Sequence, residues 1–162
     1  MTINTSMAGR RTQTAKGKFI PDNPQKYFGG SVDDITYRSS WEWTMMRYFD
    51  AHPEVIGWSS ETCAIPYFNP FTKRQTVYVP DFVIVYQDKS GKKHAEMIEV
   101  KPAKEVPGLT EGKISKRDQA AQALNYIKWQ AALSFCKKRK IGFRVMTENE
   151  IYAANANKRK KK

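Results

Sequence analysis

Residues 78–102, YVPDFVIVYQDKSGKKHAEMIEVKP, place the tightest limit on how this chain can fold. Two runs rich in β-branched and aromatic residues flank the turn sequence DKSGKK, which is the pattern of an antiparallel β-hairpin. Extending each run to its polar borders predicts strands at 74–86 and 92–101. Both strands carry charged residues inside apolar sequence, and this needs a physical explanation.

Three of these charged residues are predicted to meet. Residues two apart share one face of a strand, so Glu99 and Lys101 project together. Pairing of the two strands brings Asp81 toward Glu99. Two close carboxylates repel each other unless a cation or a proton lies between them.

The type of ligand indicates which cation would fit there. Oxygen ligands without a thiolate or histidine cluster favour Mg²⁺ or Mn²⁺ over zinc. Lys101 would then orient a metal-activated water or stabilise charge that grows on a phosphate. The hairpin therefore predicts a divalent metal site that acts on phosphate.

Each residue also has a simpler structural explanation. Pro80 alone would fit an edge strand, and Asp81 alone would fit a solvated position. Glu99 and Lys101 could form an exposed pair that contributes little to stability. The combination of these residues in order is harder to obtain by chance.

The segment YRSSWEWTMMRYFDAHPEV predicts an amphipathic helix that begins after an N-cap at Ser39 or Ser40 and is stopped by a proline. Glu42 lies at the shoulder of its apolar stripe. It either faces the sheet or pairs with a surface neighbour, Arg38 or Arg47. The stripe consists of Trp41, Met45, Tyr48 and Phe49.

The remaining elements predict a mixed α/β (α+β) fold. A strand at 62–68 joins the two hairpin strands in an antiparallel meander. After the loop 102–113, a long helix ends near Arg139, a strand follows at 141–147, and 148–155 forms a short helix. A helical crossover lets the strand at 141–147 pair in parallel. The predicted order is α-βββ-α-β, a mixed β-sheet flanked by helices.

Length and composition set wider limits. A chain of 162 residues that is 40% hydrophobic fits one domain with a real core. No apolar run approaches the roughly 20 residues that span a bilayer, and residues 1–19 do not resemble a signal peptide, so we expect a cytosolic protein without a membrane partner. Cys63 and Cys136 are predicted buried thiols, and His52 and His94 ordinary surface residues.

Positive charge is concentrated at the two ends of the chain. Residues 1–30 carry five Lys or Arg and one acid, and residues 102–162 carry fifteen and five, whereas residues 31–101 carry eight and ten. Basic groups gain affinity for a polyanion by releasing counterions from its phosphates. The layout favours nucleic-acid binding around a centre that keeps its carboxylates for another purpose.

Several motifs together resemble a known superfamily. PDF at 80–82, EVK at 99–101 and RSSWE at 38–42 look like the motifs of PD-(D/E)XK nucleases, which share a restriction-endonuclease-like core. Blocks in order over about residues 30–150 resemble more closely the head completion nucleases of T4-like tailed phages. The endonuclease subunit of Tn7-type transposases is similar at a greater distance.

The resemblance implies an activity and a setting. It implies a Mg²⁺-dependent deoxyribonuclease, with Mn²⁺ as an alternative cation, that cuts packaged or end-exposed DNA as an endonuclease or exonuclease before head-tail joining. The implied partners are DNA and phage head, portal or neck proteins. The implied location is the virion head, after assembly in the host cytoplasm.

The resemblance also implies roles for individual residues. Asp81 and Glu99 match the metal-binding acids, Lys101 the catalytic lysine, and Glu42 a helical acid that binds or positions metal. Val100 would add its backbone carbonyl as a ligand. Matching or basic positions that could contact DNA are Arg38, Ser39, Lys128, Lys158, Arg159 and Lys160, and Glu61 and Trp129 lie in matching blocks with a structural role equally open.

The chain is therefore predicted to have three parts: a basic flexible arm at 1–29, a PD-(D/E)XK nuclease-like domain at 30–155, and a basic tail at 156–162. The leading hypothesis is in-line hydrolysis of a phosphodiester that leaves a 5′-phosphate and a 3′-hydroxyl. Two alternatives stay open. One is a non-catalytic head-closure or DNA-clamping protein, and the other is a nuclease that resolves branched DNA.

Overall fold

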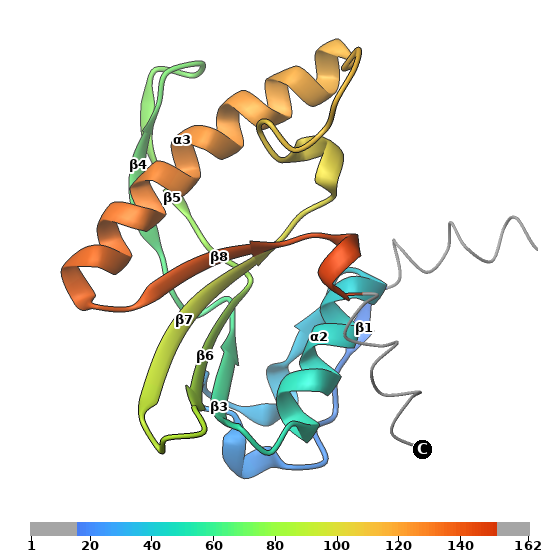
Figure 1. Ribbon diagram of the computed structural model, residues 1–162, viewed down its shortest axis with the longest axis vertical. Coiled ribbons are helices and arrows are strands. Elements are labelled where there is room, and N and C mark those ends of the chain that lie inside the picture. Colours follow the sequence, from blue (N-terminus) through green and yellow to red (C-terminus); the bar gives the residue numbers. More distant parts are fainter. Residues whose placement is uncertain (1–15, 152–162) are drawn as a thin grey trace, which may run out of the picture.

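The computed structural model describes residues 16–151, which form a four-stranded mixed sheet with helices on both of its faces (Figure 1). The strand order is β3-β6-β7-β8. The β3-β6 and β6-β7 pairs are antiparallel, and β7-β8 is parallel, as the helical crossover predicted. The predicted class, a mixed sheet flanked by helices, is confirmed. The sheet strands are β3 (Val55–Ser60), β6 (Phe82–Gln87), β7 (Lys93–Val100) and β8 (Gly142–Met146).

Helix α2 (Ser40–Ala51) covers one face of the sheet. It begins after Ser39, whose side chain accepts a hydrogen bond from the Glu42 N–H at 3.1 Å. The helix packs its apolar stripe against the alternate residues of β6 and β7 that point to this face. The fully buried members of this core include Met46, Phe49, Trp58, Phe82 and Ile98.

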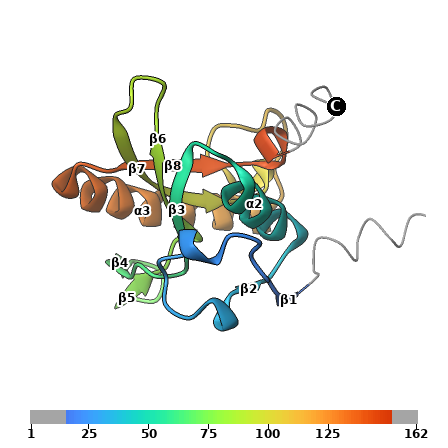
Figure 2. The ribbon, with the colours of Figure 1, turned by 90° about the horizontal axis from the view of Figure 1, so that it is seen from below.

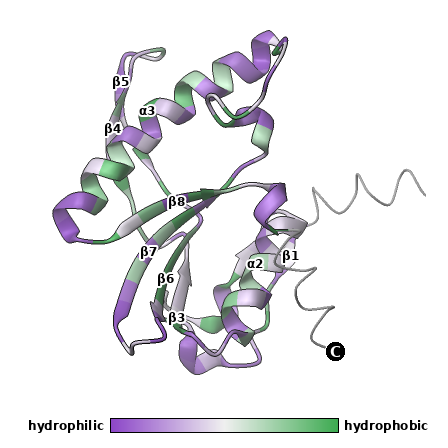
Figure 3. Ribbon diagram, viewed as in Figure 1, coloured by the Kyte–Doolittle hydropathy of each residue, from purple (hydrophilic) through white to green (hydrophobic). Residues whose placement is uncertain are grey.

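Helix α3 (Lys116–Arg139) covers the opposite face, so α2 and α3 lie on different sides of β3 and β6 (Figure 2). Ser115 caps its first turn, and Lys140 ends it in the left-handed conformation. Trp129, Ala132 and Cys136 pack on Met97 of β7. The ends of β6 and β7 that lie near β8 are largely hydrophobic, whereas the turn that joins β6 to β7 is hydrophilic (Figure 3).

The strand predicted at 74–86 is two strands that belong to different sheets. Strand β5 (Arg74–Tyr78) pairs with β4 (Ile65–Asn69) in a separate hairpin, and β6 begins only at Phe82. The ladder breaks at Pro80, which has no N–H to donate. The predicted three-stranded meander is therefore wrong in this detail.

Strand β3 was not predicted, although its core is apolar. Gly57 hides the pattern, because glycine is a weak strand former. The structure explains this residue: a Cβ at position 57 would lie 3.0 Å from the Phe28 ring and 3.2 Å from the Lys26 carbonyl oxygen. Glycine lets the N-terminal segment cross close to β3.

Residues 16–29 are part of the folded domain, contrary to the prediction that 1–29 forms a flexible arm. Strand β1 (Gly17–Lys18) pairs with β2 (Thr36–Tyr37), and Phe19 is buried in the core. The Tyr27 ring lies 4.8 Å from that of Trp58. Residues 16–29 pack on the α2 side of the sheet because their aromatic residues Phe19 and Tyr27 contribute to that core.

Short helical segments and the bounds of the described residues complete the fold. Three short 3₁₀ helices occur at Pro24–Lys26, Val32–Asp34 and Ala103–Glu105. A helical turn begins at residue 148, where the last helix was predicted. Residues 1–15 and 152–162, including the predicted DNA contacts Lys158, Arg159 and Lys160, lie outside the described residues. Neither α2 nor α3 is long and apolar enough to cross a membrane.

Candidate active site

The predicted meeting of Asp81 and Glu99 is confirmed by the register of β6 and β7. Phe82 pairs with Ile98, so Asp81, one residue before β6, lies across from Glu99. The Val100 N–H donates a 2.7 Å hydrogen bond to Oδ2 of Asp81. The break at Pro80 thus places the aspartate at the end of the sheet, where its side chain closes onto β7.

Glu99 is a buried acid whose hydrogen-bonding capacity is only half used. Its residue exposure is 4%, and its Oε1 lies 3.5 Å from the Nζ of Lys101. Among residues 16–151, its buried Oε2 has no hydrogen-bond partner. A buried carboxylate oxygen without a partner is costly, so this oxygen is suited to bind a cation or a proton.

Two more buried polar groups surround Glu99. The Tyr78 hydroxyl and the Trp129 Nε1 also have no hydrogen-bond partner in the described part of the chain. Burial first, and then the nearby Glu99 carboxylate, raise the pKa of the Tyr78 hydroxyl, which stays protonated and able to donate toward Glu99. Sequence reasoning missed Tyr78, and its position three residues before Asp81 carries no local signal of this role.

The two carboxylates destabilise each other's charged form. Burial and then the charge of Glu99 raise the pKa of Asp81 well above its usual range, although the Val100 N–H opposes this shift. Burial also raises the pKa of Glu99, against the lowering effect of Lys101. The pair therefore stores electrostatic repulsion that a proton or a divalent cation would relieve.

This donor set fits a hard divalent cation. The free oxygen of Glu99, the second oxygen of Asp81 and the adjacent Val100 carbonyl are all oxygen donors on one short stretch of sheet. Within residues 16–151, however, no three His, Cys, Asp or Glu side chains form a metal-binding group. Two carboxylates, rather than three, would hold the ion in the arrangement described.

The third predicted acid, Glu42, is engaged elsewhere. Its Oε2 accepts a 2.9 Å hydrogen bond from the backbone N–H of Arg38. Burial raises the pKa of Glu42, and the charges of Glu61 and Glu99 raise it further. Glu42 is thus close enough to feel the acid pair without joining it as a ligand in this arrangement.

Arg38 and Ser39 have structural partners. The Ser39 hydroxyl caps α2, and the Arg38 guanidinium lies 3.2 Å from the Glu61 carboxylate in an exposed ion pair. The predicted DNA contacts of these two residues stay a prediction. Glu61 has a positive φ of 54°, an uncommon conformation for this residue, and its N–H binds the Asp81 carbonyl.

Lys128, predicted as a DNA contact, lies at the acid pair. Its Nζ is 5.7 Å from the centre of the Tyr78 ring. Burial and the charge of Lys101 lower the pKa of the Lys128 ammonium, whereas Glu99 raises it. Helix α3 therefore brings a second cationic side chain to the same end of the sheet as Lys101.

A cavity of about 740 Å³ opens beside Lys101 and Val100. Three basic residues line it, which suits a phosphate-bearing ligand next to the carboxylates. The basic residues are Lys101, Lys104 and Arg117, and the remaining wall comes from Ser39, Trp41, Glu42, Val100, Pro102, Glu105 and Glu148.

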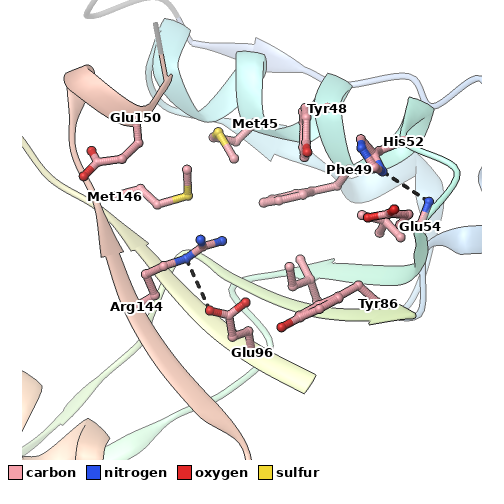
Figure 4. Close-up of a pocket in the computed structure, with 12 residues that line it drawn as sticks. Met45, Tyr48, Phe49, His52, Glu54, Tyr86, Glu96, Arg144, Met146 and Glu150 are labelled. Carbon is pink, nitrogen blue, oxygen red and sulfur yellow. Dashed lines mark hydrogen bonds and ion pairs between the residues drawn. The ribbon is translucent and has the colours of Figure 1, made fainter. Parts of the chain in front are cut away.

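A second cavity, of about 470 Å³, lies on the α2 face, apart from Asp81 and Glu99 (Figure 4). Glu96 of β7 and Arg144 of β8 line this cavity and pair with each other at 3.3 Å. His52 lines it, and the neighbouring Glu54 N–H donates to the His52 ring. Three glutamates and a single arginine make this cavity a poor site for phosphate. The larger cavity beside Lys101, where three basic residues balance three glutamates, is therefore the candidate active site.

Comparisons with known proteins show the family to which the chain belongs. The family described as TnsA-like endonuclease N terminal matches residues 52–148. The head completion nuclease of Enterobacteria phage T4 is 38% identical over 145 residues, which cover 85% of this chain and 93% of that protein. The matched range includes both carboxylates, Lys101 and the whole of α3.

Proposed function

Because this chain belongs to the family of TnsA-like endonuclease N-terminal domains, we propose that it is a Mg²⁺-dependent nuclease that hydrolyses DNA phosphodiester bonds during phage head completion. One observation carries the proposal: half-buried Asp81 lies beside buried Glu99, whose Oε2 has no hydrogen-bond partner in residues 16–151 and whose Oε1 lies 3.5 Å from the Nζ of Lys101. Catalytic roles go to Asp81, Glu99 and Lys101, and Glu42 supports them from α2.

The two acids would hold the cation. Asp81 is fixed by the Val100 N–H, which leaves its other oxygen for coordination. Glu99 is held on a central strand with Tyr78 and Trp129 packed around it. When bound, the cation would polarise the scissile phosphate and activate a water for in-line attack.

Lys101 would contact the phosphate. Its side chain is 29% exposed, so the ammonium reaches both Glu99 and the basic-lined cavity. A cation fixed at this position stabilises the extra negative charge of the pentacovalent transition state. The proposed products are a 5′-phosphate and a 3′-hydroxyl.

The setting of the reaction is proposed from the relative of known role. That protein is named a head completion nuclease, and the match covers most of both chains. For this chain we propose the same stage of assembly, with packaged or end-exposed DNA as substrate and phage head, portal or neck proteins as partners. The location would be the virion head.

A supercoiled-plasmid assay tests the activity. Purified full-length protein is compared in Mg²⁺, in Mn²⁺ and in EDTA, and Glu99→Gln is assayed beside it. Glu96→Gln is the matched control, because Glu96 lies on the same strand but pairs with Arg144 at the other cavity. We expect metal-dependent nicking in the parent and in Glu96→Gln only.

Other outcomes have definite meanings. Equal cutting by Glu99→Gln would exclude the proposed acid pair as the catalytic centre. Salt-sensitive DNA binding without cutting by the parent would favour the non-catalytic clamping protein. Preferential cutting of four-way junctions over linear duplex would assign the same chemistry to a branched-DNA nuclease.

A further inference from the structure

The hairpin of β4 and β5 projects beyond the central sheet next to α3 (Figure 1). One side of it is buried: Ile65, Tyr67 and Tyr78 pack with residues of α3. Phe68 and Val77, on the other side, are 49% and 58% exposed. No described residue covers that side, so the hairpin presents an apolar ribbon face to solvent.

The charged residues of the hairpin are all basic. Residues 62–80 contain no Asp or Glu, whereas Lys73 ends the turn between β4 and β5 and Arg74 begins β5. Phe71, in the same turn, is 64% exposed. By contrast, the β6-β7 turn contains lysines together with Asp88, which accepts hydrogen bonds from Ser90 and Lys92.

The turn is held in a defined shape. The Asn69 side chain accepts a hydrogen bond from the Phe71 N–H at 2.9 Å and a longer one from the Thr72 N–H at 3.3 Å. Lys73 adopts the left-handed conformation that ends the turn. An exposed aromatic ring and two cations are thus presented without the entropy cost of ordering a loose loop.

The hairpin is joined directly to the candidate active site. Only two residues separate Tyr78, at the end of β5, from Asp81. Five strand residues at about 3.4 Å each put the turn roughly 17 Å from that end, a length equal to about five base pairs of duplex.

We propose that the β4-β5 hairpin is a DNA-binding wing that grips the duplex flanking the cleaved bond, with Lys73 and Arg74 on phosphates and Phe71 and Phe68 against sugars and bases. This inference rests on the proposed nuclease function and adds a binding surface to it. A two-stranded ribbon fits the major groove of B-DNA, and apolar side chains contact bases and sugars there. Because the hairpin carries no acid, none of its side chains repels the phosphates of the duplex.

The test measures duplex binding in a cleavage-deficient background. Fluorescence anisotropy with a 24-base-pair duplex compares full-length Glu99→Gln with the same chain carrying Lys73→Asn and Arg74→Gln. Asparagine tolerates the left-handed conformation of residue 73, so the turn is retained. The matched control carries Lys92→Ala and Lys93→Ala, which remove two charges from the β6-β7 turn.

We expect the wing variant to lose about tenfold in affinity at low salt. Its log-log salt slope should also fall by about 2, since about 0.9 counterion is released per phosphate contact. The control should change neither quantity. An equal loss in both variants, or no loss in the wing variant, would overturn the inference.

A second variant and a series of duplexes of different length distinguish loss of the binding surface from misfolding of the variant. Phe71→Ala removes an exposed ring without removing charge, and it should weaken binding while leaving the salt slope unchanged. Shortening the duplex should lower the affinity of the parent more than that of the wing variant, and equal sensitivity would contradict a wing. If the parent never cuts DNA but the wing variants still lose affinity, the nuclease proposal fails and the wing stands.

Discussion

Asp50 and Glu99 are both acids buried to 3–4% exposure, yet their surroundings are opposite. Both Asp50 oxygens accept backbone hydrogen bonds, from Asp22 at 2.8 Å and from Asn23 at 3.1 Å. Glu99 has one oxygen without a partner in residues 16–151, and a second acid lies beside it. The difference teaches that burial alone does not identify a catalytic acid, whereas an unsatisfied buried acid does point to chemistry.

The Asp50 region shows how the fold compensates a structural charge. A carboxylate in the last turn of a helix opposes the helix dipole. Lys26 offsets this by donating to the carbonyl oxygens of Asp50 and His52 at 2.9 and 2.8 Å. The N-terminal segment thus satisfies both oxygens of Asp50, whereas in the described residues Oε2 of Glu99 has no hydrogen-bond partner.

The largest expected effect is on catalysis. Glu99→Gln should lower DNA cleavage by at least about 10²-fold, because it removes a charge aimed at the reaction centre. The melting temperature of the metal-free protein should stay equal or rise, since the variant loses a buried charge without a full partner. Plasmid nicking and thermal unfolding measure the two quantities. A marked drop in stability would make Glu99 structural, like Asp50.

Asp50→Ala should have the reverse effect. It leaves the N–H groups of Asp22 and Asn23 without their acceptor, which should cost about 3 kcal/mol of unfolding free energy. Urea unfolding measures this change. Cleavage per folded molecule should remain within about twofold of the parent at low temperature, and a specific catalytic loss would break the contrast between the two acids.

Stability should depend on pH through the acid pair. The pKa values of Asp81 and Glu99 are raised in the folded protein. The folded state therefore binds more protons than the unfolded chain between the ordinary carboxyl range, about 4, and the raised values. The metal-free protein should lose stability as pH rises through this window and then level off.

Urea titrations from pH 4 to 8 would measure that pH dependence. Adding Mg²⁺ should restore stability at the upper end of the window, because the cation replaces the lost proton. Glu99→Gln should flatten the curve. A parent curve that instead rises steadily with pH would contradict the raised pKa values.

A smaller effect on activity is expected from removing the Tyr78 hydroxyl. This variant tests whether the neighbours of Glu99 hold it in place. Tyr78→Phe keeps the ring but removes the hydroxyl beside Glu99, and it should lower activity or Mg²⁺ affinity by about tenfold. A Mg²⁺ titration of the cleavage rate separates these two effects. Tyr67→Phe, on the same buried side of the hairpin, is the control and should behave as the parent.

The smallest expected change concerns Ser39, which lines the active-site cavity but also caps α2. Ser39→Ala should cost about 1 kcal/mol of stability, and Ser39→Asn should restore most of it. Binding of duplex DNA should be unchanged in both. A loss of affinity that Ser39→Asn does not repair would instead establish Ser39 as a DNA contact.

Much of the central sheet could be predicted from local signals. The turn DKSGKK and the two-residue period of the strands bring Asp81 to Glu99, and the long helix made a parallel last strand expected. The antiparallel pairing of β4 with β5 was expected from the predicted meander. The separation of this hairpin from the central sheet was missed, because a continuous apolar run hides the break that Pro80 makes. Strand β3 was missed, because Gly57 weakens the strand pattern. Its glycine is required by the close approach of residues 26–28, which lie far away in the sequence.

The sequence by itself determined that two acids and a lysine would gather at one end of a hairpin, since a short turn fixes strand register locally. Only the tertiary structure decided which buried acid is satisfied. Residues 16–29 fold back so that their backbone N–H groups bind Asp50. The Arg38 N–H donates a hydrogen bond to Glu42, and α3 brings Lys128 and Trp129 toward Glu99. Those outcomes depend on packing between segments far apart in the chain, and no local pattern encodes them.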